Sequence, residues 1–294
     1  MFAMSKNKTT FSALLVMLLW GTLFPVVKLG YTAYGIVSTG DILFFAGVRF
    51  SICGAVICLY TLIKDKQSYH AAKLSIRSIL LSGVFAIILH YAFTYCALSF
   101  TDSSKTAILK QIGVLFYVCF SFLFFKDDKV TIKKLIGVLV GFAGIIVINT
   151  DSGGVGFNIG DALIIAASFC TVFSNIISKK VFYTVKPITS TGISHFFGGV
   201  VLLIIGKCLG GNMNFVFDQS ALIMIYTCVA SIFSYCIWFT VVKNGELSKL
   251  FIIKFAEPVF ACVFGALLLG ENIFNIQYMA AFLLIAGGIY ISNK

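Results

Sequence analysis

The sequence predicts an all-α membrane protein with ten transmembrane helices, arranged as two inverted five-helix repeats. Three observations predict this fold class. The 294 residues are 60% hydrophobic and only 11% charged, with a mean hydropathy of +1.02, so there is too little charge to cover a soluble domain. Apolar runs of about 20 residues, enough to cross the hydrocarbon core, recur along the whole chain. Matching residues also recur 144 positions apart.

The ten segments are separated by short connections, so consecutive helices should run antiparallel. No strands are expected, because the runs lack a period-2 alternation. The first segment follows Lys6 and Lys8, but Pro25 and Lys28 interrupt it and no small-residue cleavage site follows. We therefore expect an uncleaved helix rather than a signal peptide. The expected helices cover 11–29, 42–63, 78–98, 104–125, 131–149, 160–179, 188–209, 220–242, 247–269 and 274–292.

Charges in the connections predict the orientation. One set of loops carries lysines, and the other set carries acids and glycines instead. Because lysine and arginine concentrate on the cytoplasmic side, both termini should be cytoplasmic. The lysine-bearing loops hold Lys64, Lys66, Lys73, Lys126, Lys129, Lys133, Lys134, Lys179, Lys180, Lys186 and Lys243, and the other loops hold Asp41, Asp102, Asp151, Asp161 and Asp218.

The net charge of +11 does not indicate nucleic-acid binding, because the lysines are spread over short loops rather than one basic face. The nine cysteines contain no CxxC pair and nearly all fall in apolar runs, which is typical of small packing residues. With only three histidines, we expect no metal and no cofactor.

An internal repeat organises the chain. A shift of 144 residues superimposes Lys110 on Lys254, Phe116 on Phe260, and Asp127 on Glu271. The same shift matches the ends of the fifth and tenth segments, 144–149 and 288–293. Five helices per copy is an odd number, so the second copy enters the membrane upside down. The two domains are expected at 11–149 and 160–292.

Lys110 and Gln111 are the first candidates for a substrate site. A charged residue at membrane depth is costly and usually functional. Lys110 could face a polar cavity and attract an anionic group. Alternatively, it could extend to the outer headgroups, since it lies about 9 Å from the expected start of its helix.

Lys254 and Glu257 form the corresponding site in the second half. They are three residues apart on one helix, so they are neighbours on its surface. They could be an ion pair that only packs, or a pair whose partner changes when substrate or a proton binds. Pro258 cannot donate to the carbonyl of Lys254, so we expect a bend with a free carbonyl there. Pro25 should likewise free the carbonyl of Gly21, next to the candidate Trp20.

Other polar residues within the apolar segments complete the candidate list. Ser168, Thr171, Asn175 and Ser178 are spaced by three and four residues, which suits either helix–helix contacts or a cavity wall. Membrane histidines and tyrosines can equally be packing or interface residues. Beyond the lysines, Gln111, Glu257 and Trp20, the substrate-binding candidates are His90, Tyr91, Asn175, His195 and Tyr235.

Several motifs together resemble the drug/metabolite transporter superfamily, in its ten-helix form with two EamA domains. The chain departs from the family pattern at Val114, where the first repeat usually has proline, and has its acid after the fourth helix only as Asp127. The resemblance rests on Trp20-Gly21 through Lys28, Arg49-Phe50, Glu257-Pro258-Val259-Phe260, Gly270-Glu271, Gly137 to Gly144, and Gly287-Gly288. It implies a transporter of the cell membrane, working as an exporter.

The charges narrow the expected cargo. Multidrug-exporting relatives use an acid in the first helix, and this chain has none there. Excess buried positive charge disfavours organic cations and favours a carboxylate, a phosphate or a zwitterion. We therefore expect a secondary transporter of an amino acid or related carboxylate, with a proton or a counter-substrate as coupling partner. A phosphate-bearing metabolite antiporter is the alternative. A membrane-embedded enzyme is a remote one, because the acids are few and scattered.

Overall fold

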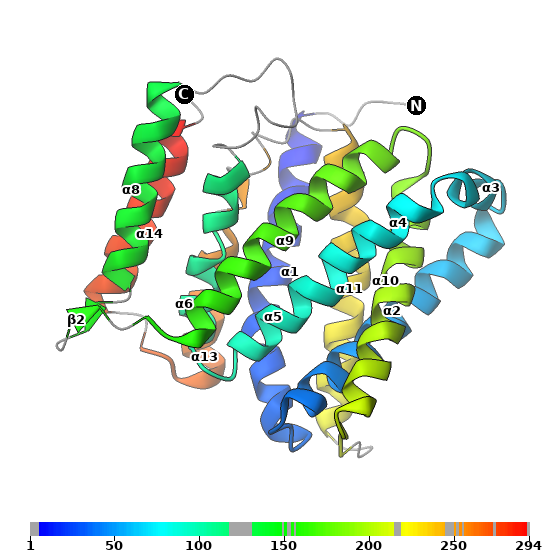
Figure 1. Ribbon diagram of the computed structural model, residues 1–294, viewed down its shortest axis with the longest axis horizontal. Coiled ribbons are helices and arrows are strands. Elements are labelled where there is room, and N and C mark those ends of the chain that lie inside the picture. The colour runs from blue at the N-terminus through cyan, green and yellow to red at the C-terminus, as the bar shows by residue number, and fades with distance from the viewer. Residues whose placement is uncertain are drawn as a thin grey trace.

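The chain forms a bundle of helices (Figure 1), seen in a computed structural model that describes residues 6–117, 131–148, 150–151, 154–155, 157–214, 219–244, 250, 253–254, 256–272 and 275–292. Within these ranges, six helical segments are long and apolar enough to cross a membrane. Five are single helices: α1 (Lys6–Ala33), α2 (Thr39–Lys64), α9 (Ile159–Val181), α10 (Pro187–Cys208) and α11 (Gln219–Asn244).

The sixth long segment is composite and matches the expected helix 78–98. It consists of α4 (Ile76–Gly83), the π-helical turn η1 (Val84–Leu89) and α5 (His90–Ala97). A π-turn widens the helix and changes the direction in which the following side chains point. This turn ends directly before His90, so it sets the orientation of the α5 side chains that face the centre of the bundle.

The helices predicted around the two matching lysines are interrupted at those lysines. α6 (Ser103–Leu109) ends just before Lys110, and the helix resumes over 112–117. α13 (Ala256–Leu269) begins two residues after Lys254. The sequence predicted continuous helices over 104–125 and 247–269; residues 118–125, 247–249, 251–252 and 255 lie outside the described part.

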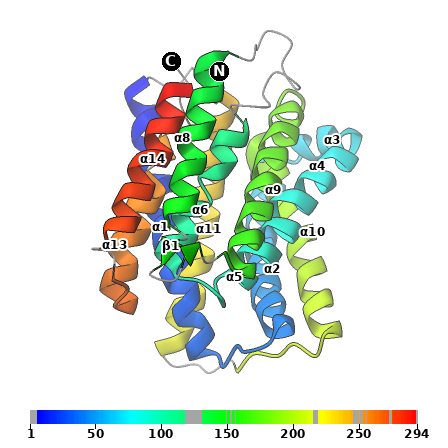
Figure 2. The same ribbon diagram turned by 60° about the vertical axis from the view of Figure 1, so that its left-hand side comes forward.

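Two pairs of helices pack closely and antiparallel. α8 (Ile132–Ile148) and α14 (Ile276–Ser292) lie side by side in both views (Figures 1 and 2). Gly144 of α8 packs against Ala281, while Gly288 of α14 packs against Gly137 at the other end of the contact. These glycines therefore allow the two helix backbones to approach closely.

The α2–α10 pair follows the same principle. Gly47 packs against Leu203, and Gly54 packs against the backbone of Phe196. Because the residue numbers of these contacts rise along α2 while they fall along α10, the two helices are antiparallel. Gly199 packs in turn against the backbone of Ser51, so neither helix surface has room for a side chain at these points.

Two elements were not expected from the sequence. α3 (Gln67–Leu74) is a short polar helix whose Ala72 packs with Ile79 in a small apolar cluster, which a search for apolar runs does not detect. The other lies in a connection between apolar runs, where β1 (Thr150–Asp151) and β2 (Gly154–Val155) pair antiparallel. Two residues a strand are too few to show a period-2 pattern.

The two ends of the bundle differ in charge. α1 begins and α14 ends at the edge where α3 lies (Figure 1). We call this the lysine-rich end; among the described residues it carries Lys64, Lys66, Lys73, Lys179, Lys180, Lys186 and Lys243. At the opposite end, Asp41 and Asp161 lie in first helical turns rather than in loops. Each completes a capping box, with Ser38 and Asn158 respectively.

Candidate functional site

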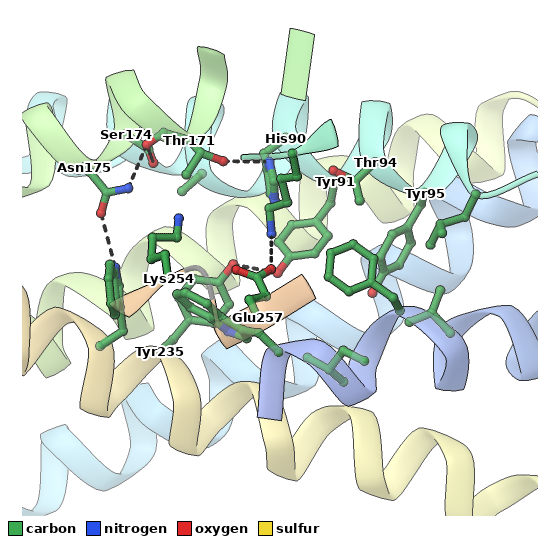
Figure 3. Close-up of a pocket in the computed structure, with 18 of the residues that line it drawn as sticks. His90, Tyr91, Thr94, Tyr95, Thr171, Ser174, Asn175, Tyr235, Lys254 and Glu257 are labelled. Carbon is green, nitrogen blue, oxygen red and sulfur yellow. Dashed lines mark hydrogen bonds and ion pairs between the residues drawn. The ribbon is translucent and has the colours of Figure 1, made fainter. Parts of the chain in front are cut away.

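A cavity of about 50 Å³ lies in the centre of the bundle. Its wall is formed by residues on or directly beside α1, α5, α6, α9, α11 and α13, and by one residue of α2. Figure 3 shows polar side chains entering it from opposite sides. Its polar and aromatic lining comprises Trp20, Phe24, Arg49, His90, Tyr91, Thr94, Tyr95, Lys110, Thr171, Ser174, Asn175, Tyr235, Trp238, Phe239, Lys254 and Glu257.

Lys110 points into this cavity rather than toward the headgroups. Its Nζ lies 2.9 Å from Oε1 of Glu257, and its side chain is 13% exposed. The local cause is the end of α6: the amide of Gln111 donates to the carbonyl of Ile108, three residues back, which tightens the turn. The alternative in which Lys110 extends to the membrane surface is therefore wrong for this conformation.

Glu257 connects the two halves of the chain. Its side chain is fully buried, and its ion pair with Lys110 joins the first turn of α13 to the residue that follows α6. The second carboxylate oxygen, Oε2, has no hydrogen-bond partner among the described residues. A buried carboxylate with one oxygen paired and one open can accept a further donor from the cavity.

Lys254 lies beside this pair, within the same cavity (Figure 3). The expected free carbonyl at Lys254 is not present, because the amide of Glu257 donates to it at 3.0 Å. A tightened turn replaces the bond that Pro258 cannot make. The interruption before α13 therefore positions the ammonium group of Lys254, while the backbone carbonyl of Lys254 stays hydrogen-bonded.

Trp20 lies close to both lysines. Nζ of Lys110 lies 5.9 Å from the centre of its ring, and Nζ of Lys254 lies 5.8 Å from it. At these distances the ring face attracts both cations. Trp20 also packs against Tyr235 and Trp238, with ring centroids 5.5 and 5.2 Å away. The indole thus interacts with both cationic side chains of the cavity.

Tyr91 and Tyr235 meet in the cavity wall. Their hydroxyl oxygens lie 2.6 Å apart, and the residues are 144 positions apart in the chain. This is the same spacing that relates Lys110 to Lys254. Two residues separated by the spacing of the internal repeat are therefore in direct contact at this point.

A polar face of α9 and α5 forms the opposite wall. Nδ1 of His90 lies 3.1 Å from the carbonyl of Ala167 and 3.0 Å from the hydroxyl of Thr171. Asn175 donates to the carbonyl of Thr171 at 2.8 Å and accepts from the indole of Trp238 at 3.3 Å.

The polar residues spaced by three and four along α9 divide between the two expected roles, cavity wall and helix–helix contact. Thr171 and Asn175 line the cavity. Ser178 instead bonds Ser82 of α4 at 2.7 Å, and Ser168 donates to the carbonyl of Lys110 at 3.1 Å. The latter two residues therefore make helix–helix contacts.

Arg49 is the main cavity residue that the sequence reasoning missed. Its Nε donates to the carbonyl of Thr227 on α11 at 3.2 Å. It also donates to the hydroxyl of Ser231. Nη1 has no partner among the described residues, and the residue lines the cavity. A lone arginine within an apolar run was the available signal.

Two candidates do not reach the cavity. The amide of Gln111 bonds the carbonyl of Ala107 one turn earlier, at 3.4 Å. Nδ1 of His195 bonds the carbonyl of Thr191 at 2.9 Å, and its ring packs against Tyr235 from behind, with centroids 4.4 Å apart. Neither residue is part of the cavity lining. Helical spacing places a residue on a face but does not show which face meets the cavity.

Trp238, Thr94 and Tyr95 line the cavity as well, although we did not include them among the candidates. Trp238 follows Tyr235 by three residues on α11, so helical spacing already placed it on the same face. Within the described ranges, no group of three or more histidine, cysteine, aspartate and glutamate side chains could hold a metal ion.

Comparisons with known proteins agree with this architecture. The chain is 25% identical over 292 residues to a probable amino-acid metabolite efflux pump of Escherichia coli (strain K12), covering 95% of this chain and 93% of that protein. It is 26% identical over 300 residues to the uncharacterized transporter YoaV of Bacillus subtilis (strain 168), covering 95% and 94% of the two chains.

A crystal structure with 18% sequence identity superimposes with a TM-score of 0.68, covering 98% of this chain and 96% of that chain, which shows a shared fold. The model of the EamA-like transporter family matches residues 7–150 and again residues 158–293. Together with its apolar helices, these matches make the chain a multi-pass membrane protein. It belongs to the EamA-like transporter family, within the drug/metabolite transporter superfamily.

Proposed function

We propose that this chain is a secondary transporter that exports a zwitterionic metabolite, an amino acid or a related carboxylate, across the cytoplasmic membrane by alternating access. The family membership supports the transport activity. The similarity to a probable amino-acid metabolite efflux pump supports the cargo class and the direction.

The observation that carries the proposal is a set of buried polar atoms without partners. Five such atoms belong to residues lining the cavity: Trp20 Nε1, Arg49 Nη1, Thr94 Oγ1, Tyr95 Oη and Glu257 Oε2. A buried polar atom without a hydrogen bond costs about 1–3 kcal/mol. A polar molecule in the cavity would satisfy these atoms, so their concentration there supports a polar ligand.

The types of these atoms favour a zwitterion over a simple anion. The Arg49 guanidinium and the Trp20 indole supply donors for a carboxylate, and Lys110 and Lys254 add positive charge nearby. Glu257 supplies an acceptor that suits an ammonium group. A phosphate-bearing metabolite would use the cations but would bring further negative charge close to Glu257. This carboxylate therefore supports an amino acid above the phosphate alternative.

Alternating access would rest on two inverted repeats, residues 11–149 and 160–292, with ten membrane crossings. The equivalent helices α2 and α10 pack antiparallel, as do α8 and α14, which supports an inverted arrangement. The Tyr91–Tyr235 contact supports a cavity on the axis between the halves. We place the lysine-rich end, with both termini, in the cytoplasm.

Counterflow in proteoliposomes tests this function. Liposomes are preloaded with an unlabelled amino acid, and the labelled compound is added outside. They should accumulate the label in their interior, with saturable kinetics. Accumulation should be strongest within a panel of α-amino acids, weaker for organic phosphates and absent for organic cations. Counterflow of sugar phosphates but of no amino acid would favour the antiporter alternative. Conversion of a compound without flux would indicate an enzyme.

A further inference from the structure

A second cavity, of about 280 Å³, lies at the lysine-rich end of the bundle. It is formed where α2 ends, α10 begins and α11 ends, so it lies away from the central cavity and shares no lining residue with it. We call it the basic end cavity; the residues used below are Tyr60, Lys64, Asp65, Lys186, Thr189 and Lys243.

The basic end cavity has an excess of positive charge. Lys186 pairs with Asp65, Nζ to Oδ2 at 2.7 Å. Lys64 and Lys243 also line the cavity, and neither makes an ion pair with any described residue. Two ammonium groups that line one cavity and have no ion-pair partner among the described residues favour an anionic ligand.

The beginning of α10 adds hydrogen-bond donors. Its N-cap, Lys186, makes no side-chain capping bond, and Pro187 occupies the first turn. The first-turn amides of Ile188 and Thr189 therefore lack an intrahelical acceptor, and a helix N-terminus of this kind favours anions. An independent observation points the same way: the hydroxyl of Thr189, a residue only 1% exposed, has no partner among the described residues and belongs to the cavity lining.

We propose that the basic end cavity binds the phosphate group of an anionic phospholipid from the adjoining leaflet. Lysines, a helix N-terminus and a buried hydroxyl together match the chemistry of a phosphate monoanion. The cavity also continues onto apolar surface. Val56, Tyr60 and Ile63, one face of α2, are 48%, 55% and 69% exposed. This face leads from the cavity toward the middle of the helix, where acyl chains would lie, and a free phosphate would leave it unused.

The proposal does not depend on the transport activity, and binding measurements test it directly. The purified full-length chain in detergent is titrated with phosphatidylglycerol, with phosphatidylethanolamine of the same acyl chains, and with inorganic phosphate. Native mass spectrometry counts bound lipid and a thermal shift reports stabilisation. We expect tighter binding of phosphatidylglycerol than of phosphatidylethanolamine, and no comparable effect of inorganic phosphate at the same concentration.

Variants locate the site. Lys64→Gln combined with Lys243→Gln should weaken phosphatidylglycerol binding at least about tenfold, since each lysine near the surface contributes to anionic lipid binding. Thr189→Val, of nearly the same shape, should weaken it less but measurably. The matched control combines Lys66→Gln with Lys73→Gln, which removes two lysines from the same end but outside the cavity lining.

Three outcomes would overturn the proposal. The first is equal binding of the two lipids, and the second is equal loss of binding in the control variant. The third is an inorganic phosphate effect as large as that of phosphatidylglycerol, which would assign the cavity to a soluble anion. If the lysine variant fails to fold, Thr189→Val decides alone: unchanged phosphatidylglycerol binding would contradict the assignment.

Discussion

Lys110 and Glu257 place a buried ion pair between the two halves of the chain. Such a pair contributes little net stability, because removing two charges from water offsets their attraction, but breaking it leaves an uncompensated buried charge at a cost of about 3–5 kcal/mol. The intact pair therefore adds little stability, whereas losing one partner is costly, and this suits a site in which a ligand replaces one of the two charges. A ligand that supplies its own charges can replace one partner without leaving the other isolated.

Lys110→Ala and Lys254→Ala should each abolish flux of the cargo, because each removes a cation from the cavity wall. Lys110→Ala should also lower thermal stability, since it leaves Glu257 unpaired. The double variant Lys110→Ala/Glu257→Ala should recover much of that stability while flux stays absent. Flux in proteoliposomes and thermal unfolding of the same preparations measure the two effects separately.

The matched control is Lys105→Ala. Lys105 lies one turn earlier and pairs with Asp161 at 3.1 Å, outside the cavity lining. It should retain transport at a rate close to that of the unaltered chain. Full flux in both Lys110→Ala and Lys254→Ala would refute the role of the paired lysines.

The buried charges were the part of the site that could be predicted from sequence. A lysine or glutamate within an apolar run is rare enough to stand out, so Lys110, Lys254 and Glu257 were identified without coordinates. Gln111 and His195 were misplaced, because their side chains bond carbonyls of their own helices. The partners of Arg49 lie on α11, far away in the chain, so only the fold shows that it reaches the cavity.

At the scale of elements, glycines set how closely α2 and α10 approach. A Cβ added at Gly54 would meet the backbone of Phe196, which cannot move aside as a flexible side chain can. Gly54→Ala should therefore destabilise the fold by about 1–3 kcal/mol through overpacking. A lowered midpoint of thermal unfolding in detergent would report it.

Gly287→Ala provides the comparison. Gly287 also lies in a helix, α14, but has no heavy atom near the position of an added Cβ. Alanine there should be neutral or stabilise by about 0.5–1 kcal/mol, because glycine is the poorer helix former. Equal destabilisation by both substitutions would show that helix propensity, rather than close packing, decides the outcome.

Glu271 ties the end of α13 to the beginning of α6. Oε1 accepts from the amide and hydroxyl of Ser103 at 2.8 Å each, and Oε2 accepts from the amide and hydroxyl of Ser104 at 3.0 and 2.5 Å. Burial raises the pKa of Glu271, but these hydrogen bonds outweigh it and hold the pKa below its ordinary value of 4.5.

This lowered pKa predicts a pH dependence of stability. The contribution of Glu271 is present in full above the unfolded-state pKa and is lost as the pH falls through the lower pKa of the folded state. Glu271→Gln should therefore lower thermal stability at pH 7, by about 2 kcal/mol. The difference from the unaltered chain should shrink as the pH falls below about 4.5.

Asp102→Asn is the control for this series. Asp102 lies 3.6 Å from Lys28 but its side chain is 57% exposed, so the substitution should cost less than about 1 kcal/mol. A difference between Glu271→Gln and the unaltered chain that stays constant down to pH 3 would contradict the assignment.

Helix positions were largely predictable, because long apolar runs determine them. The interruptions at Lys110 and Lys254 were not, since a short break hardly changes the mean hydropathy of a window of about 20 residues. The π-turn before His90 was equally invisible, because an apolar run does not distinguish a π-turn from an α-helix.

At the scale of the whole molecule, the contact between Tyr91 and Tyr235 brings equivalent positions of the two halves together. A double-mutant cycle measures what this contact contributes. Tyr91→Phe and Tyr235→Phe should each lower stability, and the double variant should lower it by little more than one of them, because the same hydrogen bond is lost. The expected coupling is about 1 kcal/mol. Strictly additive effects would show that the hydroxyls do not interact.

The central claim is that Glu257 accepts the ammonium group of a zwitterionic cargo. Counterflow of an amino acid and of its N-acetyl derivative tests this most directly, in the unaltered chain and in Glu257→Gln. We predict that the unaltered chain moves the free amino acid about tenfold faster or more, a difference of about 1.4 kcal/mol, and that Glu257→Gln loses this preference. Equal rates for both compounds in the unaltered chain, or an unchanged preference in Glu257→Gln, would contradict it.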